Sequence, residues 1–245
     1  AVLRVCHEHR VPVTPAAGRS GVTGASVPVF GGVLLDLSNL HGVVHFDEVS
    51  GVVEVVAGTF GPDLEREIGA HGHSVGHFPQ SFDLATVGGW VACRGAGQYS
   101  TRYGKIEDMV VGLEVVLADG TVVRTGGAPA AAAGPDLTQL FVGSEGTLGV
   151  VTRVWLRTHA VSGPPAMASY AFDSFEDGID ACRRIIQRGA TPAVLRLYDA
   201  PESARGQGGD LREELDGNRK TALRCGLEQL EQAQPVDPFH DQEVL

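Results

Sequence analysis

The chain is poor in positive charge and in cysteine. Its 245 residues include 19 lysines and arginines against 30 aspartates and glutamates, which gives a net charge of −11. An acidic chain of this kind gives no electrostatic support to nucleic-acid binding. The cysteines are widely spaced and form no CxxC pair. This spacing favours free thiols in a reducing compartment over a disulfide or a metal site.

Long apolar runs and several common motifs are also missing from the sequence. No run approaches the roughly 20 apolar residues that span a bilayer, and no signal-peptide pattern opens the chain, so we expect a cytoplasmic protein without a transmembrane segment. The sequence contains no GxGxxG entering a helix, no GxxxxGK[ST] and no GxSxG. Rossmann, P-loop and α/β-hydrolase sites therefore lack their core residues.

Histidine offers one further candidate site. His71, His73 and His77 form an HxHxxxH pattern, but no set of carboxylates or cysteines nearby completes a metal site. We therefore expect no metal at this cluster.

Glycine, by contrast, is abundant, with 33 residues concentrated in loops. Three glycine-rich stretches stand out, at residues 15–24, 76–110 and 143–149. Only glycine lets the main chain approach a ligand very closely or adopt positive φ without strain. The composition therefore predicts a large polar ligand lying against the backbone of these loops.

The apolar pattern predicts helices and strands throughout the chain. Thr59 is expected to cap a helix that runs to Ala70, and Pro135 to open a short helix toward Leu140. Asp119-Gly120 is expected to join two strands within 110–125. The other expected elements are a helix end over 1–10, strands at 33–37 and 150–156, and two strands within 43–57.

A break at residues 163–165, Gly-Pro-Pro, precedes a second unit. We expect a strand over 167–172, a helix over 175–188 and a strand over 193–198, with few partner strands available from the remaining residues. An amphipathic helix is expected over 223–230. The last residues, 232–245, have too little apolar content to order themselves.

Four motifs occur in a fixed order: PxxGxSGxxG from Pro15, PxSxDxxTVGGW from Pro79, YGxIEDMV from Tyr103 and GSEGTLGVV from Gly143. Together they resemble the FAD-binding domain of vanillyl-alcohol-oxidase-type flavoproteins, and within that group the alkyldihydroxyacetonephosphate synthases and their bacterial relatives. The resemblance covers about residues 1 to 205. It implies an α+β fold, with a PCMH-type FAD-binding domain of two α/β subdomains followed by the start of a ferredoxin-like cap domain.

The same resemblance implies a domain organisation and a cofactor. Residues 1–160 are expected to form the FAD-binding domain without its N-terminal strand, 166–205 the start of a truncated substrate or cap domain, and 206–245 a polar tail. FAD is expected to be non-covalent, because Val22 and Thr23 stand where some relatives carry the histidine that links to flavin.

Residue roles also carry over from the resemblance. It implies that Arg196 faces the flavin and the substrate phosphate, for which a guanidinium is well suited. The residues expected to contact FAD are Pro15, Ala16, Ala17, Gly18, Arg19, Ser20, Gly21, Gln80, Ser81, Phe82, Asp83, Leu84, Ala85, Thr86, Cys93, Arg94, Gly95, Ala96, Glu145, Gly146, Thr147, Leu148, Gly149, Val150 and Val151.

Three functions remain open at this point. The first is an alkyldihydroxyacetonephosphate-synthase-like flavoenzyme, which exchanges acyl for alkyl on dihydroxyacetone phosphate in ether-lipid synthesis. The second is an FAD-dependent dehydrogenase of a 2-hydroxy acid such as D-lactate or glycolate. The third is a fragment without activity that binds FAD weakly. We expect a small-molecule or lipid-like substrate, and the sequence is compatible with a homodimer. No residue is assigned as a catalytic acid or base.

Overall fold

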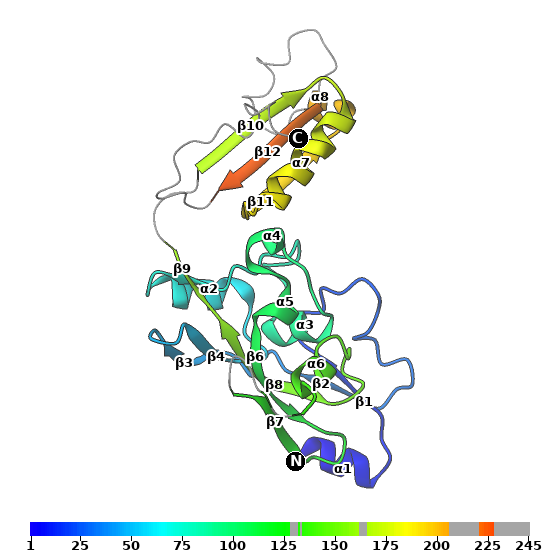
Figure 1. Ribbon diagram of the computed structural model, residues 1–245. Coiled ribbons are helices and arrows are strands. Elements are labelled where there is room, and N and C mark those ends of the chain that lie inside the picture. The colour runs from blue at the N-terminus through cyan, green and yellow to red at the C-terminus, as the bar shows by residue number, and fades with distance from the viewer. Residues whose placement is uncertain (128–131, 133, 162–165, 206–220, 228–245) are drawn as a thin grey trace. The chain divides into compact units, whose positions relative to one another are not determined.

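The structure is a computed structural model that describes residues 1–127, 132, 134–161, 166–205 and 221–227 (Figure 1). It divides into two compact units, residues 1–161 and residues 162–245. Among the described residues, no helix combines the length and the apolar character needed to cross a membrane.

An antiparallel sheet of five strands forms the centre of the first unit. Its late strand β8 lies between two hairpins, so residues far apart in the sequence become neighbours. The hairpin expected around Asp119-Gly120 is confirmed, as are the strands expected within 43–57 and at 150–156. In sheet order the strands are β3 (Val43–Asp47), β4 (Val52–Val56), β8 (Val150–Arg157), β6 (Val110–Val116) and β7 (Val122–Gly126).

The described residues of this unit also form two smaller sheets and six helices. β1 (Val13–Ala16) pairs in parallel with β2 (Val33–Asp36), and β5 (His73–Ser74) pairs with β9 (His159–Ala160). The strand expected at 33–37 and the helix expected within 1–10 are both present. The helices are α1 (Val2–Glu8), α2 (Gly61–Gly69), α3 (Val87–Ala92), α4 (Ser100–Tyr103), α5 (Ile106–Met109) and α6 (Leu137–Phe141).

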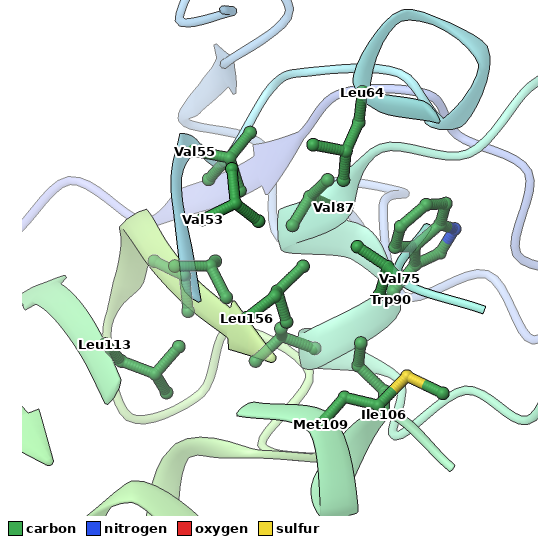
Figure 2. Packing of buried hydrophobic residues seen from close by; sticks show 14 of the residues in the cluster. Val53, Val55, Leu64, Val75, Val87, Trp90, Ile106, Met109, Leu113 and Leu156 are labelled. Carbon is green, nitrogen blue, oxygen red and sulfur yellow. The ribbon is translucent and has the colours of Figure 1, made fainter. Parts of the chain in front are cut away.

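The core lies between one face of the five-stranded sheet and helices α2, α3 and α5 (Figure 2). Val53 and Val55 of β4 are fully buried while Val52, Glu54 and Val56 are half-buried, as expected when alternate residues of a strand face opposite sides. Burying each such side chain stabilises the fold by about 1.5–3 kcal/mol. From the helices, Leu64, Val87, Trp90, Ile106 and Met109 complete this core.

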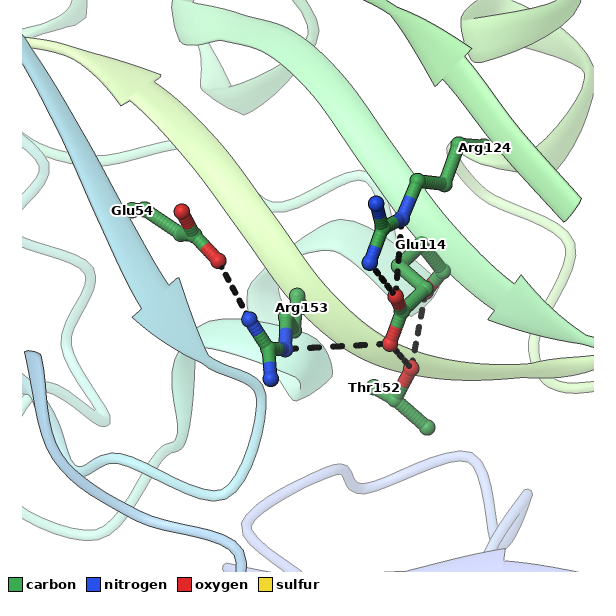
Figure 3. A network of polar contacts seen from close by, with 5 residues as sticks. All are labelled: Glu54, Glu114, Arg124, Thr152 and Arg153. Carbon is green, nitrogen blue, oxygen red and sulfur yellow. Dashed lines mark hydrogen bonds and ion pairs between the residues drawn. The ribbon is translucent and has the colours of Figure 1, made fainter. Parts of the chain in front are cut away.

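The sheet also carries a row of alternating charges that crosses four strands (Figure 3). Arg153 contacts Glu54 at 2.6 Å and Glu114 at 3.8 Å. Arg124 donates two hydrogen bonds to Glu114 Oε2, at 2.7 and 2.9 Å. Burial alone would raise the pKa of Glu114, but hydrogen bonds from Arg124 and Thr152 outweigh it and lower that pKa. The row ties β4, β8, β6 and β7 together.

Two helix starts differ from the expectation. Thr59 does not cap α2, whose first residue follows Phe60. Instead the Thr59 hydroxyl donates to the Val56 carbonyl at 2.7 Å and accepts from the Gly42 amide at 2.8 Å, which fixes the turn after β4. Similarly, Pro135 does not open α6, which begins at Leu137. Asp136 is its N-cap, because the Asp136 carboxylate accepts from the amides of Thr138 and Gln139.

The second unit contains a three-stranded antiparallel sheet in the order β10-β12-β11. The predicted strand, helix and strand are present as β10 (Ala166–Phe172), α7 (Phe175–Gln187) and β11 (Val194–Tyr198), followed by α8 (Ala200–Arg205). Residues 228–230 of the helix expected over 223–230 lie outside the described residues. Over 223–227 that expectation is wrong, because β12 (Thr221–Leu227) is a strand. Its pairing with both neighbours overrides a short apolar run that fits either structure. β12 is a partner strand for both β10 and β11.

Candidate cofactor site

The glycine-rich loops of the first unit meet at one cleft. The cleft is lined by small residues and backbone from separate parts of the chain, as expected of a site that accepts a ligand against the main chain. Its lining comprises Pro15, Ala16, Ala17, Gly18, Arg19, Ser20, Gly21, Thr23, Ala25, Ser26, Leu37, Ala57, Pro79, Ser81, Ala85, Thr86, Gly88, Gly89, Trp90, Ala92, Cys93, Gly95, Ser144, Glu145, Gly146, Gly149, Val150 and Val151.

The first loop, which follows β1, presses directly on the second. A Cβ atom at Gly18 would lie only 2.1 Å from the carbonyl oxygen of Leu84, so only glycine fits there. The next residue, Arg19, has φ of 53° and pairs with Asp36 at 2.7 Å. Hydrogen bonds from Ser38, assisted by Arg19, lower the pKa of Asp36. The loop conformation is therefore set by contacts on both of its sides.

The backbone of this loop is available to a ligand. Within the described part of the chain, the amides of residues 17–21 donate no hydrogen bond to another protein group. Successive unused N–H groups in a tight turn form a concave site for an anion such as a pyrophosphate. Arg19 lines the cleft at the same place, with its guanidinium paired to Asp36.

The second loop leads into α3, whose start is fixed at several points. The Thr86 hydroxyl accepts from the Gly89 amide at 3.4 Å, which makes Thr86 the N-cap of the helix. The Gly88 amide donates to the Ala57 carbonyl at 2.7 Å, and a Cβ atom at Gly88 would lie 2.7 Å from the Ala57 Cβ. This close packing holds the helix start against the end of β4.

The third loop closes the cleft between the other two. The amides of Gly143 and Glu145 donate to the carbonyls of Val91 and Ala92, at 2.9 and 3.0 Å. A Cβ atom at Gly146 would lie 2.6 Å from Pro15 Cγ in the first loop. The loop therefore contacts both the end of α3 and the start of the first loop, and φ is positive at Glu145.

Arg94, which follows α3, takes part in a group of ion pairs at the start of α5. Arg94, with φ of 54°, contacts Glu107 at 3.3 Å, and Lys105 contacts the same carboxylate oxygen at 2.6 Å. Burial would raise the pKa of Glu107, but hydrogen bonds from Lys105 and Arg94 lower it overall. Arg94 is thus engaged in an ion pair and does not line the cleft.

The structure brings together most of the residues that the sequence motifs single out. All seven residues from Pro15 to Gly21 line the cleft, while eight others do not: Gln80, Phe82, Asp83, Leu84, Arg94, Ala96, Thr147 and Leu148. Contact with FAD stays a prediction for the whole set. Arg196 lies on β11 of the second unit, and its role also stays a prediction.

Several lining residues were not expected from the sequence. Thr23, Ala25 and Ser26 follow the first loop, while Leu37 and Ala57 come directly after β2 and β4. All of them except Leu37 are small. Small residues in a loop form no sequence pattern that would mark them as part of a site. Only the folded position of these residues reveals them.

A cleft of glycine-rich loops with unused amides is what an FAD-binding domain requires. The sequence model of the FAD binding domain family matches residues 1–126, and the chain belongs to this family. The expected α+β fold with a PCMH-type FAD-binding domain is confirmed, and the cofactor is FAD.

Several individual proteins are similar to this chain, and their names differ. The chain is 36% identical over 206 residues to the uncharacterized FAD-linked oxidoreductase YgcU of Escherichia coli, covering 83% of this chain and 43% of the relative. It is 32% identical over 205 residues to the alkyldihydroxyacetonephosphate synthase of Dictyostelium discoideum, covering 82% and 33%. It is also 33% identical over 201 residues to the glycolate oxidase subunit GlcD of Bacillus subtilis, covering 82% and 43%.

A solved structure of an alkyldihydroxyacetonephosphate synthase is also similar to this chain. The TM-score is 0.81 at 27% identity, over 93% of this chain and 44% of that one. The chain therefore spans less than half the length of the proteins that it matches here.

The residues present fit FAD. The amides of the first loop suit the pyrophosphate, and the glycines of all three loops leave room for backbone to lie against the cofactor. FAD supplies redox chemistry when it is bound, and the protein's part is to hold and orient it.

Proposed function

We propose that this chain is the FAD-binding part of a flavoenzyme of the alkyldihydroxyacetonephosphate-synthase type, which replaces an acyl group by an alkyl group on dihydroxyacetone phosphate. The observation that carries the proposal is the cleft, in which three separate loops converge on backbone suited to FAD. Support for the substrate comes from similarity to the synthases in both sequence and structure.

In this proposal the first loop takes the cofactor pyrophosphate on its free amides, and the hydroxyls of Ser81 and Thr86 add polar contacts from the second loop. FAD is held without a covalent bond, since Val22 and Thr23 provide no imidazole. Arg196 binds the substrate phosphate, because a guanidinium can meet a phosphate with two parallel hydrogen bonds.

A second candidate is the FAD-dependent oxidation of a 2-hydroxy acid. It is favoured by the similarity to GlcD and by 33% identity over 202 residues to the D-lactate dehydrogenase [cytochrome] 1 of Saccharomyces cerevisiae. The cleft itself supports both candidates equally, because it is a cofactor site and both reactions use FAD.

Two assays on the FAD-reconstituted protein separate the candidates. One supplies an acyl-dihydroxyacetone phosphate with a long-chain alcohol and measures the alkyl product. The other supplies D-lactate or glycolate with a dye that accepts electrons. We expect product in the first assay and no dye reduction in the second. Dye reduction without ether product would establish the 2-hydroxy-acid reaction instead, and FAD binding without either product would support an inactive fragment.

A further inference from the structure

Three buried side chains beside the cofactor cleft carry polar atoms without a partner. Among the described residues these atoms are both ring nitrogens of His77, Nε1 of Trp90 and Oε2 of Glu107. His77 is 0% exposed, Trp90 2% and the Glu107 side chain 11%. More than nine in ten buried polar groups have a partner, and leaving one unpaired costs about 1–3 kcal/mol. These atoms therefore require an explanation.

His77 contacts the Trp90 ring and lies beside Gly95, whose backbone is hydrogen-bonded to Trp90 and to the residue before Glu107. The rings of His77 and Trp90 meet edge to face, with centroids 4.8 Å apart. A Cβ atom at Gly95 would lie 3.5 Å from His77 Nε2, and the Gly95 amide donates to the Trp90 carbonyl at 3.0 Å. The Gly95 carbonyl in turn accepts from the amide of Ile106, the residue before Glu107.

One side of this cluster is held firmly. The other carboxylate oxygen of Glu107, Oε1, binds Lys105 and Arg94. The Glu107 backbone carbonyl accepts from Gln139 at 2.8 Å. These contacts fix the Glu107 side chain, so it cannot rotate to bring Oε2 to another protein donor. Oε2 therefore needs a hydrogen-bond donor from outside the protein.

The unpaired atoms match the hydrogen-bonding capacity of water. Trp90 offers an N–H donor and Glu107 a carboxylate acceptor, while a neutral imidazole offers one donor and one acceptor. A buried water molecule makes about three hydrogen bonds to such groups. We propose that His77, Trp90 and Glu107 bind an internal water molecule, located behind the wall that Trp90 and Gly95 contribute to the cofactor cleft.

This water contacts the cleft wall rather than the cofactor. Its role is to connect the cleft wall to the ion-paired Glu107 by hydrogen bonds. The water site does not depend on which substrate the enzyme uses. The chain offers a direct probe, because it has only two tryptophans, Trp90 and Trp155. Trp155 lies half-buried on β8 and its Nε1 is not among the unpaired buried atoms, so it serves as the internal control.

The test is nuclear magnetic resonance of the 15N-labelled protein, with and without FAD. Trp90→Phe assigns the two indole N–H signals, and Trp155→Phe assigns them equally if the first variant does not fold. We expect the Trp90 N–H to show cross-relaxation with a long-lived water molecule in both states. Absence of that water contact, its disappearance when FAD is added, or a direct bond between His77 and Glu107 in a high-resolution crystal structure would overturn the proposal.

Discussion

At the residue scale, glycines decide how closely the loops of the cleft approach one another. Gly18 lies against the Leu84 carbonyl, Gly88 against Ala57, and Gly146 against Pro15. In each case a side chain would collide with backbone or with a rigid ring, so the neighbour cannot simply move aside. The cleft therefore depends on residues that contribute no functional group of their own.

Gly18→Ala should weaken FAD binding strongly. The added methyl group would lie 2.1 Å from the Leu84 oxygen and force the first two loops apart. We expect the dissociation constant to rise at least about tenfold, which corresponds to about 1.4 kcal/mol. Fluorescence titration with FAD measures it. Gly69→Ala is the control, because its Cβ atom would meet nothing within 4 Å. Equal affinities for the two variants would contradict the packing argument.

His77 should make the protein less stable in acid. Burial lowers the pKa of His77 from 6.5 to about 4, although the charge of Glu107 opposes this. The unfolded chain therefore binds the proton more readily, so the contribution of His77 to stability is complete above pH 6.5. It is lost as the pH falls from 6.5 toward 4, by up to about 3 kcal/mol.

The measurement is the free energy of unfolding of the wild type and of His77→Gln at pH 7 and at pH 4.5. Carboxylates with lowered pKa values destabilise both proteins in acid, so the comparison isolates His77. We expect the wild type to lose more stability than the variant between the two pH values. Parallel losses would show that His77 is not held neutral by its surroundings.

At the scale of elements, the order of strands in the large sheet brings the site together. β8 follows the third loop and pairs with both β4 and β6. The end of β4 meets the start of α3, and the third loop meets its end. One short helix thus fixes two of the three loops, which explains why α3 is tightly packed although it has only 6 residues.

The charge row on the sheet should contribute measurably to its stability. Glu114 binds Arg124, Thr152 and Arg153, and its side chain is 14% exposed. Glu114→Gln should lower the free energy of unfolding by about 1–3 kcal/mol, because the largely buried Glu114 side chain would lose its charge-assisted hydrogen bonds from Arg124. Chemical denaturation measures this. Asp63→Asn, which breaks an exposed pair with Arg66, should change stability by less than about 1 kcal/mol. If both substitutions change the free energy of unfolding by similarly small amounts, the charge row does not stabilise the sheet.

How much the sequence predicts also differs by element. Strands with alternating apolar residues and the turn at Asp119-Gly120 were predictable, because local chemistry specifies them. Thr59 was predicted as a cap but serves a turn, since its hydroxyl finds partners in another strand and loop. β12 was predicted as a helix because its identity depends on pairing with strands distant in the sequence.

The candidate site was likewise predictable only where local sequence restricts the residue type. The glycine motifs predicted the three loops, because backbone approach to a ligand restricts residue type strongly. Thr23, Ala25 and Ser26 were not predicted, since small loop residues occur everywhere. The cluster of His77, Trp90 and Glu107 was also missed, because its members come from different elements and meet only in the folded chain.

At the scale of the whole molecule, the central claim is that residues of the first unit form the FAD site by themselves. Every loop that lines the cleft lies within residues 1–161. The second unit and the substrate enter only through the proposed function. The cofactor claim can therefore be tested without knowledge of the substrate.

The most direct test is titration of the purified, flavin-free chain with FAD, followed by visible absorption and by calorimetry. The account predicts saturable binding of about one FAD per chain, with a perturbed flavin spectrum and strong weakening by Gly18→Ala. Binding that does not saturate, or that is unaffected by Gly18→Ala, would contradict it.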